Sequence, residues 1–376
     1  MSIRSVLIAT DLPTPDHGPG QRLLSLRTAL AAAGECRFVW LAPEGTRALP
    51  ASADYLVPSP LPDDGRRGGW LPSELTELRP HPPALEGREA IRREFPFDLA
   101  VCHLFRSTVA APLDRVPCLL DADRLPEPEG RLPKLLWPMT RRAMNRRATA
   151  FDTVFVIRSA DGPVLEDART ELLPAISATA GPPVDPDREA RHVLFVGSMS
   201  SEPNREAAEL LATTVAPRLL AADSGCIVRL VGAGTEAFAG MPGVSAVGYV
   251  EDLAEEYRRA RVVACPTWRG VGGSVKLAEA LQLGCAILAS PHAADGFRGL
   301  VVPGRSLRIA RSPELFSASL LELLADEGSL LALRREAREV AGRFLGQRHI
   351  SRIVRRVAER AVRSRDAAPS AQPREA

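Results

Sequence analysis

The sequence predicts an α/β protein built from two Rossmann-like domains that face an interdomain cleft. Short strands that are apolar throughout alternate with helical segments, and such strands are typical of parallel sheets covered by helices on both faces. The same alternation starts again after a loop-like segment near mid-chain. The length of 376 residues also suits two domains better than one.

The N-terminal domain is expected over residues 1–175. It opens with a strand at Ser5–Thr10, a Pro/Gly loop over 11–20 and a helix that Gly34 ends. Residues 50–88 are rich in Pro, Gly and charge, so we expect them to be irregular. Further strands are predicted at 37–41, 98–102, 117–121 and 153–157, and a basic helix at about 132–149.

Residues 176–191 form the predicted linker, and the C-terminal domain is expected over 192–345. A helix over 346–363 is expected to pack back on the N-terminal domain, and 364–376 are expected to be a disordered tail. The strands of the second domain are predicted at 193–196, 227–231, 246–248, 262–266 and 286–290, and its helices at about 204–222, 274–283, 313–325 and 327–345.

Composition excludes several classes of protein. Lys+Arg 48 against Asp+Glu 46 gives no field that would favour nucleic acid. Six scattered cysteines without metal spacing, together with the lack of a signal peptide or an 18-residue apolar run, predict a reduced, cytoplasmic protein. The chain has only two lysines, Lys134 and Lys276, which indicates a GC-rich, bacterial genome in which a retained lysine is informative.

The segment 264–284 is the strongest candidate for a ligand site. A strand ends at Pro266, glycines follow, and a helix opens near Ser274, where backbone N–H groups suit a diphosphate. Lys276 and Glu279 are i and i+3 on that helix and therefore neighbours, so they could serve a phosphate and a pair of hydroxyls. Spacing alone favours the plainer alternative of a surface Lys–Glu pair.

The run GVGGSVKLAEALQLGCAILASPHAADG resembles the donor-site segment of family 4 glycosyltransferases, which have the GT-B fold. LFVGSM at 194–199, Pro203-Asn204, LVGAG at 230–234 and VGYVED at 247–252 agree with the family in order. The N-terminal half agrees more weakly, through HGPGQR at 17–22, DLAVCHLF at 98–105 and LLDADRL at 119–125.

The resemblance implies a site residue by residue. Glu279 would bind the donor ribose hydroxyls, Lys276 the diphosphate, and His103 would face the sugar as the catalytic candidate. Gly272 stands where many members carry a glutamate that touches the sugar, so the sugar is not identified. Donor binding is implied for Gly18, Gly20, Gly197, Arg269, Gly272, Gly273, Ser274, Val275, Lys276 and Glu279, without a metal or a resident cofactor.

The function implied is transfer of a sugar, with retention of configuration, from a nucleoside-diphosphate sugar to a small-molecule, glycan or lipid-linked acceptor. The alternative is a catalytically silent GT-B protein that binds a nucleotide or assists a partner enzyme, which Gly272 motivates. A NAD-dependent oxidoreductase is disfavoured because no G-x-G-x-x-G follows the first strand.

Other polar residues allow plainer interpretations. His103 could be a structural histidine as well as a catalytic one. Asp121 and Asp123 are expected to make polar contacts at a strand end, because two carboxylates alone are weak evidence for a metal. The basic segments 134–147 and 348–363 are interpreted as solvated or packed helix faces, with peripheral membrane contact as the minority alternative.

Overall fold

The computed structural model divides the chain into two units. One consists of Met1–Leu173 with Gln347–Ala376, and the other of Pro174–Gly346. Each unit has its own parallel sheet. The structure describes residues 3–10, 18–43, 46–47, 49, 53–59, 81–111, 116–123, 125, 131–175, 177, 183, 191–222, 224–270 and 274–366.

The N-terminal unit is built on a seven-stranded parallel sheet with the order β3-β2-β1-β4-β5-β6-β7. The order reverses at β1 and β4, which makes this pair the switch point of a doubly wound sheet. The strands are β1 (Ser5–Thr10), β2 (Glu35–Pro43), β3 (Tyr55–Ser59), β4 (Leu99–His103), β5 (Cys118–Ala122), β6 (Thr153–Val156) and β7 (Thr170–Leu172).

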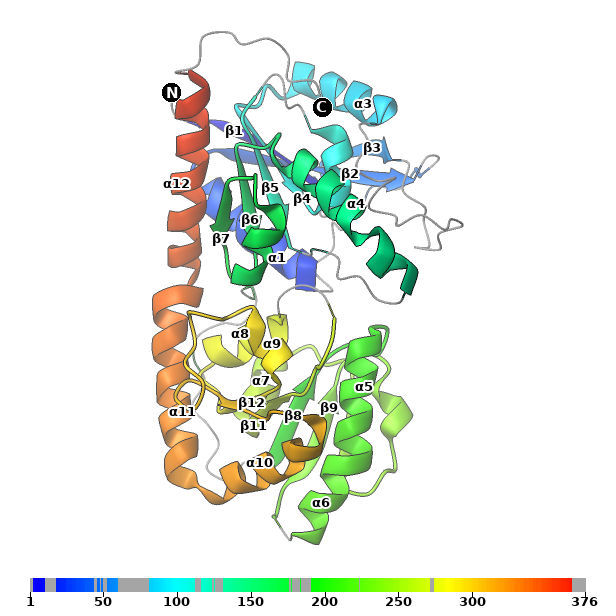
Figure 1. Ribbon diagram of the computed structural model, residues 1–376, viewed down its shortest axis with the longest axis vertical. Helices are drawn as coiled ribbons and strands as arrows, with labels where there is room; N and C mark the ends of the chain where they lie inside the picture. Colours follow the sequence, from blue (N-terminus) through cyan, green and yellow to red (C-terminus); the bar gives the residue numbers. More distant parts are fainter. Residues whose placement is uncertain are drawn as a thin grey trace. The chain divides into compact units, whose positions relative to one another are not determined.

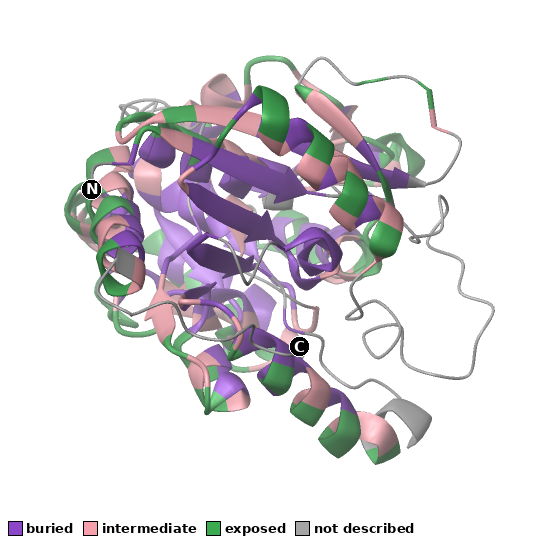
Figure 2. Cartoon of the chain, turned by 90° about the horizontal axis from the view of Figure 1, so that it is seen from above, coloured by how far each residue is buried: buried purple, intermediate pink, exposed green. Residues whose placement is uncertain are grey.

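Helices cover this sheet, as Figure 1 shows for the N-terminal unit. One layer of the core joins alternate residues of β1, such as Leu7 and Ala9, to Ile91 of α3 and Met144 of α4. In Figure 2 the central strands are mostly buried, whereas helices such as α12 carry a buried and an exposed face. The helices are α1 (Gly18–Ala31), α3 (Pro82–Glu94), η1 (Phe105–Ala110), α4 (Arg131–Ala148), η2 (Ser159–Leu165) and α12 (Gln347–Asp366).

The last helix, α12, packs on the N-terminal unit through contacts with α1 and β5. Its apolar stripe, which includes Ile350, Val354 and Val357, is buried at helical spacing. Arg356 on its polar side pairs with Glu171. Because the apolar face is already covered, the structure agrees with the preferred interpretation of 348–363 as a packed helix face.

Two expectations for the N-terminal half are wrong. The stretch 50–88 is not irregular throughout, since it contains β3 and the start of α3, although 60–80 lie outside the described residues. Gly18 and Gly20 lie in the first turn of α1 and not in the loop before it. Gly20 is buried there, and a glycine that starts a helix allows close packing of the backbone.

The C-terminal unit repeats the same topology on a six-stranded parallel sheet, β10-β9-β8-β11-β12-β13, with β8 and β11 at the switch point. This repetition confirms the predicted fold class of two Rossmann-like domains. The strands are β8 (His192–Val196), β9 (Ile227–Val231), β10 (Val244–Gly248), β11 (Ala260–Cys265), β12 (Ile287–Ala289) and β13 (Arg308–Ile309).

The core of the C-terminal unit joins the sheet to helices on one face through Phe195, Leu211, Leu230 and Phe316. Within the part of the chain that is described, no helix is long and apolar enough to cross a membrane. The helical elements are α5 (Glu202–Leu210), η3 (Leu211–Val215), α6 (Ala216–Ala221), η4 (Thr235–Phe238), α7 (Leu253–Arg258), α8 (Val275–Gln282), α9 (Pro291–Asp295), α10 (Pro313–Ala325), α11 (Glu327–Val340) and η5 (Ala341–Leu345).

Candidate functional site

The switch point of the C-terminal sheet brings together the segments that the sequence singled out. In open α/β sheets, ligands bind beyond the carboxyl ends of the strands at such points. Gly197 follows β8 directly, and nine residues separate the end of β11 from the start of α8, which has Ser274 as its N-cap. The site is therefore built from the loop after β8, the loop after β11 and the first turns of α5 and α8.

Ser274 leaves the start of α8 polar. Its side chain does not cap the helix, and its buried hydroxyl oxygen has no hydrogen-bond partner among the described residues. The first N–H groups of a helix have no partner within the helix either, so such an end favours anions. Val275 is the first residue of α8, while Gly272 and Gly273 lie outside the described residues.

Lys276 connects α8 to α5 and β8, the elements on the other side of the switch point. Its ammonium donates a hydrogen bond of 2.6 Å to the Asn204 side-chain oxygen on α5 and lies 4.8 Å from the centre of the Phe195 ring on β8. Burial lowers the pKa of Lys276. An ammonium carries three N–H donors, and within the described segments Asn204 accepts one of them, so the ammonium can also serve an anion.

Gly197 permits this arrangement. A Cβ atom at Gly197 would lie 2.9 Å from the side-chain amide of Asn204, closer than real contacts allow. That amide also donates to the Ser198 carbonyl oxygen at 3.0 Å. The glycine after β8 therefore lets Asn204 approach the loop and hold Lys276.

Glu279 lies one turn further along α8 and is 7% exposed. One of its carboxylate oxygens accepts a hydrogen bond of 2.8 Å from the Tyr257 hydroxyl on α7, and the Ser177 side chain also hydrogen-bonds the carboxylate. Burial raises the pKa of Glu279, and these two hydrogen bonds and the charge of Lys276 partly oppose the rise.

Lys276 and Glu279 are thus not the surface ion pair that spacing alone favoured. Glu279 is buried and Lys276 is half-buried, and each is held by a different partner, Asn204 for the lysine and Tyr257 for the glutamate. Burying an ionisable group is unfavourable unless its partners compensate. Two such groups beside an anion-favouring helix end make this a candidate binding site.

The candidate arginines are engaged elsewhere. Arg269, on the loop after β11, pairs with Glu202 at 2.9 Å and Glu206 at 2.6 Å on α5. Arg205 donates to the backbone carbonyl oxygen of Met199 at 2.7 Å and so closes the loop after β8. Arg269 carries a charge that two carboxylates already balance, so Lys276 is the better placed cation for a phosphate.

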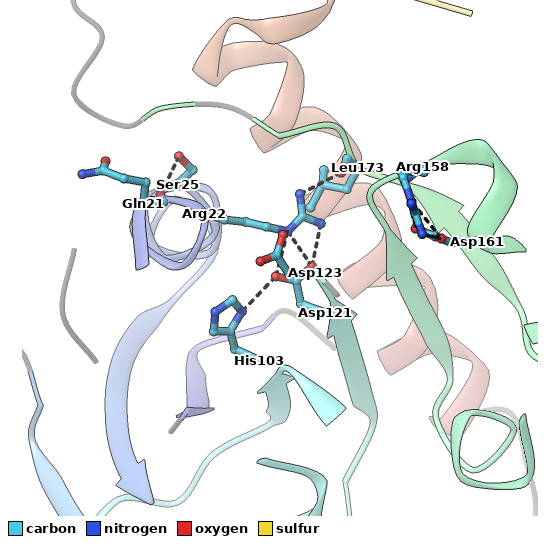
Figure 3. Close-up of polar contacts among 9 residues, drawn as sticks. All are labelled: Gln21, Arg22, Ser25, His103, Asp121, Asp123, Arg158, Asp161 and Leu173. Atoms are coloured by element: carbon cyan, nitrogen blue, oxygen red, sulfur yellow. Dashed lines mark hydrogen bonds and ion pairs between the residues drawn. The ribbon is translucent and has the colours of Figure 1, made fainter. Parts of the chain in front are cut away.

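The N-terminal unit has a polar network at its own switch point (Figure 3). The Arg22 guanidinium on α1 donates to both carboxylate oxygens of Asp121 at 2.6–3.0 Å and to the Leu173 carbonyl oxygen at 2.7 Å. Asp123 lies 3.8 Å from Arg22. These contacts agree with the expectation that Asp121 and Asp123 make polar contacts at the end of a strand.

His103 ends β4 beside this network and is 0% exposed. Its Nδ1 lies 3.1 Å from Asp121, its partner in the strand register, whereas Nε2 has no hydrogen-bond partner among the described residues. Burial would raise the pKa of Asp121, but Arg22 and His103 outweigh it and lower that pKa to about 2. Because an ionised carboxylate only accepts, Nδ1 carries a proton, and Nε2 is the ring nitrogen left to meet another group.

Backbone strain marks the same place. Leu104, directly after His103, has φ 69° and ψ 151°, and it is the only non-glycine residue with positive φ among those described. Such a conformation is strongly disfavoured for a leucine and is found mostly at functional sites. The packing around the end of β4 therefore keeps the backbone at Leu104 in this unfavourable conformation.

Four functional candidates were missed by sequence reasoning: Arg22, Asn204, Tyr257 and Ser177. Arg22 and Asn204 stand inside segments that carry the resemblance, but nothing in their spacing gave them a role. Within the described part of the chain, no group of three or more His, Cys, Asp or Glu side chains could hold a metal ion.

Comparison with known proteins shows which family part of this second unit is similar to. Residues 190–326 match the family described as glycosyl transferases group 1. This match includes 194–296, the segment in which the resemblance was specific, and confirms that resemblance. No match to the sequence was found among curated proteins.

Solved structures show the fold of the whole chain. Sucrose-phosphate synthase from Thermosynechococcus elongatus is similar with a TM-score of 0.70 and 17% identity, over 96% of this chain and 100% of that one. HepE from Anabaena, in complex with UDP and glucose, is similar with a TM-score of 0.64 and 12% identity, over 95% of this chain and 100% of that one. WaaG, a glycosyltransferase involved in lipopolysaccharide biosynthesis, is similar with a TM-score of 0.60 and 15% identity, over 93% of this chain and 99% of that one. The chain has the GT-B fold of these glycosyltransferases.

Proposed function

We propose that this protein is a glycosyltransferase that moves a sugar from a nucleoside-diphosphate sugar to an acceptor hydroxyl. The observation that carries the proposal is the pair of separately held charges on α8, the half-buried Lys276 and the buried Glu279, beside the polar start of that helix. The match of residues 190–326 to group 1 glycosyl transferases and the UDP bound in HepE support it.

The donor would be held at two points of α8. The diphosphate would lie at the N-terminus of α8, beside the Ser274 hydroxyl, the first backbone N–H groups and Lys276. The carboxylate of Glu279 would accept hydrogen bonds from the ribose hydroxyls, because an ionised carboxylate offers two acceptor oxygens and no donor. A cation and an acceptor one turn apart match the phosphate-to-ribose order of a nucleotide.

The chemistry then follows from the charge that develops. As the bond between the anomeric carbon and the β-phosphate oxygen breaks, negative charge collects on the departing diphosphate. Lys276 and the helix N–H groups are fixed in place before the reaction, so they stabilise that charge without reorganising. Lys276 must be protonated for this role, and its lowered pKa makes the stabilisation weaken as pH rises.

His103 is proposed as the N-terminal unit's contact with the reacting sugar. Its Nδ1 is committed to Asp121, so Nε2 is the atom that would meet a substrate hydroxyl. We further propose that the configuration at the anomeric carbon is retained, as the family resemblance implies, and that the acceptor is a small molecule, a glycan or a lipid-linked glycan. A proton NMR spectrum of the product linkage tests retention once an acceptor is known.

Calorimetric titration tests the donor site. UDP, ADP, GDP, CDP and dTDP would be titrated into wild-type protein and into Glu279→Gln. We expect one nucleotide to bind and the variant to bind it roughly 10 to 100 times more weakly, because hydrogen bonds to a charged group are lost. The matched control is Glu322→Gln, an equal change on α10 at a side chain that is 69% exposed.

The outcomes separate the proposal from its rival. Binding that is lost in Glu279→Gln, together with release of the sugar from the matching nucleotide sugar, supports the transferase. The same binding without turnover on any acceptor favours the catalytically silent protein. No binding by any nucleotide to folded protein contradicts the proposed function.

A further inference from the structure

The Tyr257 side chain is almost completely buried, and its hydroxyl contacts the carboxylate of Glu279. Tyr257 lies in the last turn of α7 and is 1% exposed. Its hydroxyl is 2.8 Å from a Glu279 carboxylate oxygen and 3.4 Å from the Lys276 carbonyl oxygen. A hydroxyl has one proton to donate, and the shorter contact to a charged acceptor is the stronger, so the proton points to Glu279.

The direction of this hydrogen bond is fixed. Burial and the charge of Glu279 raise the pKa of Tyr257 well above its usual value, so the tyrosine keeps its proton. It can therefore only donate to the carboxylate. This bond uses one lone pair of one carboxylate oxygen and helps to fix the orientation of the carboxylate, which can still accept bonds from the hydroxyls of a diol.

The hydrogen bond also favours the ionised form of Glu279. Burial disfavours the carboxylate, whereas the bonds from Tyr257 and Ser177 favour it. A protonated Glu279 would have to donate from one oxygen and would accept fewer bonds from ribose. The titratable or polar groups that face Glu279 or Tyr257 are Lys276 on α8, Cys265 on β11, Cys285 before β12, and Ser177.

We propose that Tyr257 is a positioning residue that holds Glu279 oriented and ionised, so that the protein selects nucleotides carrying ribose hydroxyls. The inference rests on the proposed role of Glu279 in donor binding. It predicts that Tyr257 acts on the affinity for the ribose and not on the affinity for the diphosphate. The order of the elements along the chain accounts for this contact. Helix α7 precedes β11 and α8 follows it, so Tyr257 and Glu279 come from the two helices on either side of one strand.

The test removes one oxygen atom. UDP, ADP and GDP, each beside its 2′,3′-dideoxy counterpart, would be titrated calorimetrically into wild type, Tyr257→Phe and Glu279→Gln. In Tyr257→Phe we expect roughly five- to tenfold weaker binding of the ribonucleotide. This loss corresponds to part of the free energy of one hydrogen bond to a charged group. The dideoxynucleotide should bind wild type and Tyr257→Phe equally, and that equality shows that the phosphate site is intact.

The pH profile gives a second readout that a purely structural role would not move. Loss of the tyrosine's hydrogen bond raises the pKa of Glu279 further, so a larger fraction of the carboxyl is protonated at acidic pH. The affinity deficit of Tyr257→Phe should therefore grow as the pH falls and Glu279 becomes protonated, and shrink as the pH rises. Tyr55→Phe, the same deletion in β3 of the other unit, is the matched control and should leave both affinities unchanged.

Each outcome has one meaning. An equal ribose preference in Tyr257→Phe and wild type, while Glu279→Gln loses that preference, overturns the inference and leaves the proposed function standing. No nucleotide binding by wild type overturns both. Equal weakening of ribo- and dideoxynucleotides in a folded Tyr257→Phe also overturns the inference, because the tyrosine then supports the whole site and not Glu279.

Discussion

Asp121→Asn should destabilise the N-terminal unit strongly. Asp121 is 0% exposed and Arg22, its partner, is 3% exposed. The substitution keeps the shape of the side chain and removes its charge. It leaves the guanidinium buried beside a neutral amide, with Asp123 at 3.8 Å as the nearest remaining carboxylate.

Two estimates bound the size of this effect. An Asp121 pKa of about 2, against an ordinary value of 3.8, is worth about 2 kcal/mol of folding free energy. Removal of one partner of a buried ion pair costs roughly 3 to 5 kcal/mol. Because the asparagine oxygen still accepts one hydrogen bond and Asp123 stays close, we expect a loss of about 3 kcal/mol.

Urea unfolding followed by hydrogen exchange at the amides of β4 and β5 measures this loss in the right unit. Exchange is needed because two units can unfold separately and one midpoint would then mix them. Glu166→Gln is the matched control, since it breaks a similar carboxylate–arginine pair with Arg141 whose side chains are 61% and 39% exposed. It should have little effect.

Acid titration gives the sign of the same effect. Because the folded-state pKa of Asp121 lies below its ordinary value, its stabilisation is complete above about pH 4 and is lost as pH falls towards 2. Asp121→Asn should lack that part of the acid sensitivity. Equal stability of Asp121→Asn and Glu166→Gln, or an unchanged acid profile, would refute the electrostatic account of the network.

Three further predictions concern single side chains. The His103 ring should carry its proton on Nδ1, and two-bond ¹H–¹⁵N NMR should then show Nε2 as the unprotonated nitrogen at alkaline pH; a proton on Nε2 would refute the assignment. Lys276→Met should weaken nucleoside-diphosphate binding by roughly 10- to 100-fold, whereas Lys134→Met, at the other lysine of the chain, should not. Gly197→Ala should lower the stability of the C-terminal unit by roughly 1 to 3 kcal/mol in a urea titration, because the new methyl overlaps Asn204; an unchanged midpoint would show that the loop adapts freely.

Most of the fold could be predicted from the sequence because its strands are buried on both faces. Mostly apolar runs such as Ser5–Thr10 and Ile227–Val231 are typical of strands in a covered parallel sheet, and the structure has strands with these bounds. The element missed at β3 is an edge strand with a proline, Pro58, and one fully buried residue, Val57. Its signal is therefore that of a loop.

The helix α3 was hidden by residues that usually interrupt helices. It begins with two prolines, which suit the first turn because that turn needs no N–H donors. Gly87 lies in its middle, where a Cβ would come within 3.1 Å of Val57. The glycine that weakens the helical pattern is thus what lets α3 pack on β3.

The part of the candidate site that lies on one helix could be predicted from the sequence. The contacts between residues far apart in the sequence could not. Lys276 and Glu279 share a face of α8, so their spacing brings them together. Asn204 lies 72 residues from Lys276, and Asp121 lies 99 residues from Arg22. Local periodicity carries no information on such contacts, which arise only when the sheet sets neighbouring strand ends side by side.

A crystal structure of the protein with the nucleotide that it binds tests the central claim most directly. The account predicts the diphosphate at the N-terminus of α8, within hydrogen-bond distance of Ser274 and Lys276, and a ribose hydroxyl on the Glu279 oxygen that Tyr257 does not occupy. A nucleotide bound away from α8, or a ribose turned away from Glu279, would contradict it.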